Sequence, residues 1–257
     1  MPVVMSIDVG IKHLAVCIME KDTITKKYSI LLWEVYNTMA AEESSNICNG
    51  QFKNGKDCTR KCSMKCSNES TTEFFCKTHS PTGSKKVKPN KKVFQMSYTE
   101  IGTGMLCCME NLFVNHPEIM DRVTVVGIEL QLAKNPKMKF ASHCLLAKLI
   151  DIYRLRPVQI PIKFMRASLK LKIEYTGPTV VHTVKGAYSQ RKKCAVIYTR
   201  HFMELLEIDQ QWIDKFENCP TKRDDYADCI LYCMILLGYP MTKKVTNPKP
   251  KSNRRKK

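Results

Sequence analysis

The chain has 257 residues, 44% of them hydrophobic and 26% charged, so it can bury a core, and wholesale disorder is excluded. It contains no run of eighteen apolar residues and no secretory signal, which argues against a membrane span and secretion. No Arg- and Ser-rich import leader is visible either, although a processed leader could have been removed. The formal net charge of +18 favours a polyanionic partner, most commonly nucleic acid.

The first predicted elements are strands. Two apolar runs, Val3–Ile7 and Leu14–Met19, flank a glycine-containing turn, which predicts a hairpin with Asp8 at the end of its first strand. A third apolar run, Tyr28–Tyr36, completes a three-stranded meander. Residues 41–92 are polar, rich in Cys and Lys and without apolar periodicity, and we interpret them as an insertion.

The second half of the chain alternates helices and strands. Helical spacing over residues 94–116 precedes Arg122–Gln131, a continuous apolar run typical of a central buried strand. A helix is predicted over Met138–Tyr153, with Pro136 close to its start, and a short strand over Pro157–Phe164. The last elements are three helices and a basic tail with eight cations and no acid: Lys185–Leu206, Gln210–Glu217, Asp224–Leu237 and Lys243–Lys257. This order predicts an α/β fold with a mixed sheet.

Three acidic sites stand where acids are locally disfavoured. Asp8 and Glu129 each end an apolar strand, and three acids crowd into the turn that opens the last helix, namely Asp224, Asp225 and Asp228. Crowded or buried carboxylates repel one another and are costly to desolvate unless a cation neutralises them. A pair of Mg²⁺ or Mn²⁺ ions about 4 Å apart would do so and would support phosphodiester hydrolysis.

Each acid also has a structural interpretation. Asp8 could belong to the turn that follows it, and Asp224 fits best as a capping residue at the start of a helix. Glu129 is harder to explain in this way because Glu is depleted in buried strands. Asp225 and Asp228 are three residues apart and share a helical face. The order and spacing of the whole set favour a metal site.

Three segments resemble the motifs of RuvC-type Holliday junction resolvases of the RNase H-like superfamily. "SIDVGIKHLAV" is similar to their first motif, "VVGIELQ" to their second and "KRDDYADCILY" to their last. "IELQLAKNPKM" and the "KRDD" lead-in resemble the poxvirus and large-DNA-virus enzymes, with the fungal mitochondrial resolvases as close relatives. The resemblance implies an RNase H-like mixed five-stranded sheet flanked by helices. The Cys-rich block departs from the compact viral enzymes and puts the substrate range in doubt.

The same resemblance implies an activity and a set of site residues. It implies a homodimer that cuts branched DNA, especially four-way junctions, with Mg²⁺ or Mn²⁺, two ions per active site. Asp8, Glu129, Asp225 and Asp228 become the catalytic, metal-binding carboxylates by motif position, with Asp8 bridging both ions. Glu129 and Asp228 would complete the coordination, and Asp225 would hold the side that activates water.

Two further predictions concern phosphate binding and assembly. Lys192 and Lys193 precede the last acids and would neutralise the scissile phosphate, although a solvated helix face explains them equally well. The amphipathic helix after Pro136 is the candidate dimer surface, with a plain core helix as the simpler alternative. Two other functions use the same residues: an RNA–DNA hybrid or transposase-like nuclease, and a non-enzymatic zinc-bearing DNA-binding protein.

The insertion carries candidate zinc ligands. Without a secretory signal, we interpret the 13 cysteines as reduced thiols and metal ligands rather than a disulfide framework. A small polar segment without a core needs a tetrahedral zinc ion to fold. The ligand pair at the end of the block is compact, and two earlier cysteines flank a loop that could form a hairpin. The predicted zinc ligands are Cys48, Cys58, Cys76 and His79, with Cys62 and Cys66 as alternates.

These predictions define three regions. Residues 1–40 and 93–240 form the nuclease domain, residues 41–92 the zinc-binding insertion and a basic linker, and residues 241–257 a disordered tail. Cations interleaved in the insertion indicate contact with phosphates, and a purely structural zinc module is the competing interpretation. They are Lys53, Lys56, Arg60, Lys61 and Lys65. We expect a location in the cytoplasm or a viral replication compartment; a nuclear one stays open, and a mitochondrial one is disfavoured.

Overall fold

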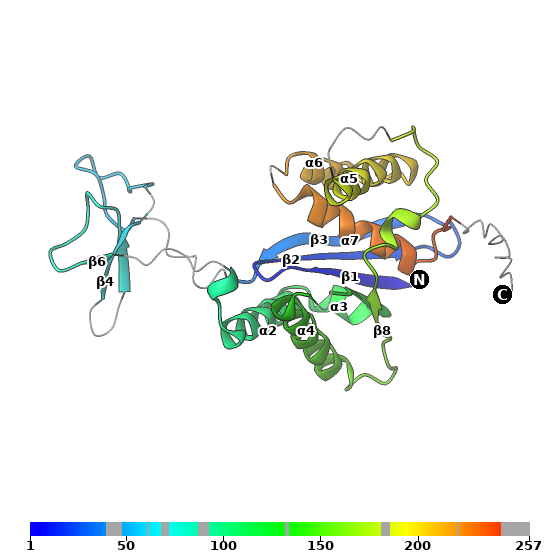
Figure 1. Cartoon of the computed structure of the whole chain (residues 1–257), viewed down its shortest axis with the longest axis horizontal. Helices are drawn as coiled ribbons and strands as arrows, with labels where there is room; N and C mark the ends of the chain where they lie inside the picture. Colours follow the sequence, from blue (N-terminus) through cyan, green and yellow to red (C-terminus); the bar gives the residue numbers. More distant parts are fainter. Residues whose placement is uncertain are drawn as a thin grey trace, which may run out of the picture.

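The structure, a computed structural model, describes residues 1–39, 48–60, 62–67, 72–86, 93–131, 134–180, 186–219 and 221–242 (Figure 1). The strands are β1 (Val3–Val9), β2 (His13–Lys21), β3 (Tyr28–Asn37), β4 (Met64–Ser67), β5 (Thr72–Phe75), β6 (Lys85–Lys86), β7 (Val125–Glu129) and β8 (Ile162–Met165). The helices are α2 (Tyr98–Asn115), α3 (Pro117–Arg122), α4 (Pro136–Tyr153), α5 (Ala187–Leu205), α6 (Gln210–Glu217) and α7 (Arg223–Leu236), with short 3-10 turns η1 (Val93–Gln95) and η2 (Lys170–Lys172). Among the described residues, no helix has the length and apolar character to cross a bilayer.

Five strands form the central sheet in the order β3-β2-β1-β7-β8. The first three strands pair antiparallel as the predicted meander, whereas β7 runs parallel to β1 and β8 runs parallel to β7. The predicted mixed five-stranded sheet flanked by helices is therefore confirmed. The parallel pairing has one further consequence, because it brings the carboxyl ends of β1 and β7 to the same edge.

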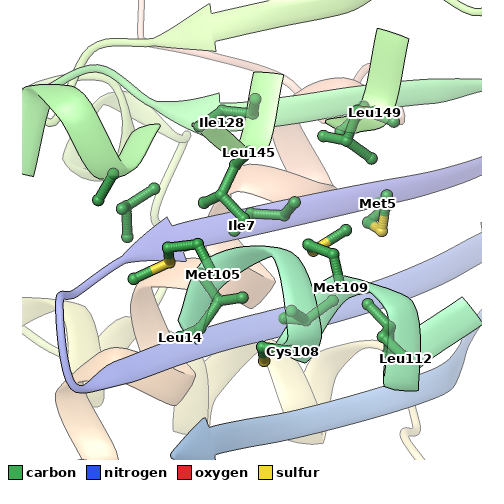
Figure 2. Packing of buried hydrophobic residues seen from close by; sticks show 14 of the residues in the cluster. Met5, Ile7, Leu14, Met105, Cys108, Met109, Leu112, Ile128, Leu145 and Leu149 are labelled. Atoms are coloured by element: carbon green, nitrogen blue, oxygen red, sulfur yellow. The ribbon is translucent and has the colours of Figure 1, made fainter. Parts of the chain in front are cut away.

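Helices cover both faces of this sheet, with α2 and α4 on one side and α5 and α7 on the other (Figure 1). Alternate residues of β1 enter the two cores. Figure 2 shows Ile7 beside Leu145 of α4 and Met105 of α2, with Met5 farther along β1 toward Met109. All of these side chains are fully buried. Burial of side chains of this size contributes about 1.5–3 kcal/mol each.

The opposite core fixes α7 against the sheet. Ser6 of β1 donates a hydrogen bond of 2.6 Å from Oγ to the Cys229 carbonyl. The Trp33 indole of β3 donates one of 3.0 Å to the Tyr226 carbonyl. At Gly127 of β7 an added Cβ would lie 2.9 Å from a Leu236 methyl group, so the absent side chain allows α7 to approach closely. These contacts set the depth and rotation of the helix that carries the last acids.

Several boundaries differ from the sequence prediction. The helix predicted from residue 94 begins at Tyr98, after a capping box in which Ser97 and Glu100 satisfy each other's backbone N–H groups. Pro117 opens the additional helix α3, so Arg122 ends a helix and the strand begins at Val125.

The last helix differs at its start. Its N-cap is Lys222, in the left-handed region at φ 69°, so the predicted capping role of Asp224 is wrong. Asp224 lies within the first turn instead. The predicted tail, Lys243–Lys257, lies outside the described residues.

The insertion forms a second, three-stranded sheet in the order β5-β4-β6, which lies to one side of the main sheet in Figure 1. Strands of two to four residues carry too little periodicity to be predicted from sequence. The predicted hairpin after Cys48 is present, because Gln51 bridges Asp57 around Gly55 at φ 77°. Phe75 and the buried cysteines make up its small core, against which Phe52 and Met64 pack.

Candidate functional site

A cleft of about 560 Å³ opens at the carboxyl ends of β1 and β7 and beside the start of α7. Its lining includes all four carboxylates that the sequence singled out: Asp8, Glu129, Asp225 and Asp228. The register of the parallel strands explains the first pair. Ile7 pairs with Ile128, so the next residue of each strand stands at the same level. The two residues from α7 complete the group because Ser6 and Trp33 hold that helix against the sheet.

Asp8 and Glu129 form a carboxyl–carboxylate pair. Burial, a hydrogen bond to Glu129 and the charges of Glu129 and Asp228 together raise the pKa of Asp8 well above its ordinary value. Burial also opposes ionisation of Glu129, yet hydrogen bonds from Asp8 and Tyr232 and the charge of Lys170 lower its pKa overall. Asp8 therefore holds its proton to a higher pH than Glu129 does.

The carboxyl group of Asp228 is a second one whose pKa is raised by its surroundings. Burial, with the charges of Glu129 and Asp224, raises the pKa of Asp228 to about 6, against the opposing effect of Lys170. Its side chain is only 10% exposed. Among the residues that the structure describes, its Oδ1 atom is buried and accepts no hydrogen bond. An acceptor oxygen of this kind is the ligand that Mg²⁺ and Mn²⁺ prefer, so the donor set fits a divalent ion.

Lys170 lies inside the acid cluster, and the sequence analysis missed it. Its ammonium group forms a salt bridge with Asp228, lies 3.5 Å from Glu129 Oε1 and stands 5.5 Å from the centre of the Tyr232 ring. Lys170 follows β8, whose Met165 pairs with Glu129, and this placement beyond a parallel strand was the available clue. The single ammonium group of Lys170 faces three carboxyl groups, those of Asp8, Glu129 and Asp228, so it can neutralise only part of their charge when all three are ionised.

Asp225 lies nearer to solvent. Lys222, three residues earlier, places its ammonium group 3.3 Å from Asp225 Oδ2. Burial and the charge of Asp224 nevertheless raise the pKa of Asp225. A divalent cation beside Asp225 would therefore also stabilise its ionised carboxylate.

The rim of the cleft is basic, and cations reach it from four elements or turns: Lys12, Lys170, Arg191, Lys192 and Lys222. Lys192, one of the two predicted phosphate-binding lysines, forms a salt bridge with Asp224 and lies 5.1 Å from the centre of the Tyr188 ring. Lys193 is exposed and does not line the cleft. The cations that sequence reasoning overlooked lie in turns and irregular segments or at helix starts, where a lysine resembles any solvated residue.

The second group of potential ligands lies in the insertion. The ligand atoms of Cys48, Cys58, Cys76 and His79 all lie within 4.8 Å of one another. Within the described ranges this is the one such group found. The acids of the cleft are farther apart, and Lys170 lies beside two of them, Glu129 and Asp228. The two alternates, Cys62 and Cys66, are not members of this group, although Cys66 of β4 packs against the same small core.

Close contacts hold this Cys/His cluster together. His79 Nδ1 lies 3.5 Å from Cys48 Sγ and 3.6 Å from Cys76 Sγ, and Cys58 Sγ lies 4.0 Å from Cys76 Sγ. Gly50 permits the approach, since an added Cβ would lie 2.6 Å from the His79 side chain. Burial opposes ionisation of Cys76, but hydrogen bonds from the backbone of His79 and Thr78 lower its pKa to about 6. A thiolate is the form that binds a metal.

The chain trace is similar to solved structures of three resolvases. The yeast mitochondrial Holliday junction resolvase gives a TM-score of 0.47 at 14% identity, over 90% of this chain and 76% of that one. The fowlpox virus resolvase with Holliday junction DNA gives 0.43 at 14% identity, over 91% and 99%. Thermus thermophilus RuvC with a Holliday junction substrate gives 0.42 at 12% identity, over 93% and 97%. No protein-family model matches the chain, and no curated protein is similar to it in sequence.

Proposed function

We propose that this protein is a metal-dependent endonuclease that hydrolyses branched DNA, four-way junctions above all. The observation that carries the proposal is the convergence of four carboxylates, from two parallel strands and one helix, on a single cleft with a basic rim. A structural role for these acids would require full neutralisation in the interior. The unsatisfied oxygen of Asp228 and the raised pKa of Asp8 argue against that role.

The chain's own residues would divide the work as follows. Asp8, Glu129, Asp225 and Asp228 would hold two Mg²⁺ or Mn²⁺ ions. Such ions supply an activated water and stabilise the leaving oxygen during phosphodiester hydrolysis.

The basic rim would bind and position the DNA. Lys12 and Arg191 would attract the phosphate backbone, which carries no sequence information and suits recognition by branched shape. Lys192 would exchange its partner Asp224 for a phosphate. The rim thus complements the charge of the substrate, while the acids complement that of the metal ions.

Two further components belong to the proposal. Cys48, Cys58, Cys76 and His79 would bind one structural Zn²⁺, because they provide four soft or borderline ligands at tetrahedral spacing. The active protein would be a homodimer, since a four-way junction has approximate two-fold symmetry and paired incision needs two sites. The predicted dimer helix, α4, packs on α2 and the sheet but leaves Ile150 half exposed.

The decisive experiment measures incision of three synthetic substrates: a four-way junction, a linear duplex and an RNA–DNA hybrid. We expect incision of the junction with Mg²⁺, none with chelator, and a loss of at least about a hundredfold in Asp8→Asn. Junction cleavage by Asp8→Asn at the wild-type rate would exclude the metal-nuclease function. Cleavage of the hybrid alone would indicate a different RNase H-like nuclease, and metal-independent binding without incision would indicate a DNA-binding protein.

A further inference from the structure

The three-stranded sheet of the insertion has two chemically different faces. Met64 and Phe75 are direct neighbours on β4 and β5, and both join the core around the cysteines. The adjacent pair, Lys65 and Phe74, must therefore face the opposite way, since side chains alternate along a strand. Lys85 of β6 pairs directly with Lys65 and shares that face. A strip of one aromatic ring and two lysines thus crosses all three strands, and we call it the Phe74 strip.

The lysine pair in this strip is unfavourable by itself. Like charges directly opposite each other on neighbouring strands are destabilising. Both ammonium-bearing residues are exposed, and no described acid forms a salt bridge with either. The described part of the insertion holds seven cations and two acids, so its surroundings add to the repulsion. A polyanion bound across the strip would attract both ammonium groups and so offset their mutual repulsion.

The partly exposed Phe74 ring favours a polyanion that also offers a flat ring for stacking. Its backbone is fixed on both sides, because its N–H donates to Asn49 Oδ1 (2.9 Å) and its carbonyl accepts from the Asn49 N–H (2.7 Å). An aromatic ring held beside two lysines matches the way in which proteins bind single strands, with phosphates on cations and a base stacked on the ring. A duplex arm offers phosphates but no free base.

We propose that the Phe74 strip binds a single-stranded segment of DNA, with phosphates on Lys65 and Lys85 and a base on Phe74. The inference rests on the proposed function only for the choice of DNA as ligand. Under this proposal, the Cys/His cluster stabilises a sheet that binds nucleic acid. A branched substrate that carries a single-stranded arm would present such bases, and the strip would bind them outside the catalytic cleft.

Neighbouring lysines offer a matched test. Lys85→Glu and Lys86→Glu alter the same charge on the same strand, but Lys86 pairs with Met64 and so stands on the opposite face. Both would be made in zinc-loaded, full-length Asp8→Asn protein, so that DNA is bound without being cut. Binding to a fluorescent single-stranded oligonucleotide and to a fluorescent linear duplex would be followed by anisotropy. Zinc content would confirm that each variant retains its fold.

We expect Lys85→Glu to weaken single-strand binding about tenfold and Lys86→Glu to have at most a twofold effect. Binding of single strands weakens as salt rises, and the slope of log K against log salt measures this dependence. In the double variant Lys65→Ala/Lys85→Ala this slope should become shallower by roughly 1.4. Phe74→Leu, which keeps the apolar bulk, should weaken single-strand binding at least about fivefold and leave duplex binding unchanged. Equal effects of the two charge reversals, or no effect of either, would overturn the proposal. Wild-type incision of junctions reports separately on the proposed function.

Discussion

Replacement of Lys170 by methionine tests how much the charge of this lysine contributes to the stability of the acid cluster. Methionine is apolar and of similar length, so Lys170→Met removes the cation and little else. The side chains of Lys170 and Asp228 are each 10% exposed and that of Glu129 is 14% exposed, so solvent screens them weakly. Removing one partner from a buried ion pair costs about 3–5 kcal/mol. Protonation of Asp228, whose pKa is already raised to about 6, limits the loss, and we expect about 3 kcal/mol.

The assay is thermal unfolding of zinc-loaded protein without and with millimolar Mg²⁺. A loss of about 3 kcal/mol corresponds to a fall in Tm of roughly 6–12 °C for a chain of this size. Mg²⁺ bound at the proposed site would favour the folded state and should restore much of the lost stability in the variant. Lys172→Met is the control, because Lys172 belongs to the same 3-10 turn but lies outside the cleft. A loss below 1 kcal/mol, or the same loss with and without Mg²⁺, would refute the reasoning.

Three other predictions concern zinc, pH and packing. Cys58→Ser should abolish zinc binding while Cys62→Ser keeps one ion per chain, as measured by elemental analysis; equal losses would contradict the ligand set. The pKa of Asp228 is about 6 in the folded protein against an ordinary 3.8, so the folded state binds this proton more tightly, and stability falls as pH rises through 6. Between pH 4 and 7.5, without divalent metal, urea unfolding should show the wild type losing about 2–3 kcal/mol relative to Asp228→Asn, and parallel curves would exclude this. Trp33→Ala should cost about 3–5 kcal/mol in urea unfolding and Trp33→Phe clearly less, because Trp33 stacks on Phe216 at 5.4 Å and holds Tyr226.

The acids were predictable because each breaks a local pattern. Glu129 at the end of an apolar strand and Asp8 before a turn are conspicuous in the sequence, and parallel pairing brings them together without further information. The Cys/His residues that the structure brings together were likewise singled out by their types and spacing.

Lys170 was not predictable from its neighbourhood. Its burial depends on contacts made by residues far along the chain. The Thr242 N–H donates to the Lys172 carbonyl, and the Glu174 N–H donates to the Pro240 carbonyl, so the end of the described chain fixes the turn that carries Lys170. Such long-range contacts leave no trace in a local window of sequence. The strands of the insertion were not predicted for a different reason, because strands of two to four residues are too short to show hydrophobic alternation.

The position of the insertion has an evolutionary consequence. The chain leaves the main sheet just after Thr38, which bonds to the Ile11 and Lys12 carbonyls, and it returns at Val93, which lines the same cleft. Lys137 fastens the return point by donating to the carbonyls of Phe94 and Met96. Both attachment points therefore border one rim, and no strand of the main sheet has to move to admit extra sequence. A lineage could acquire, lose or exchange an accessory module here while keeping the main sheet and its cleft unchanged.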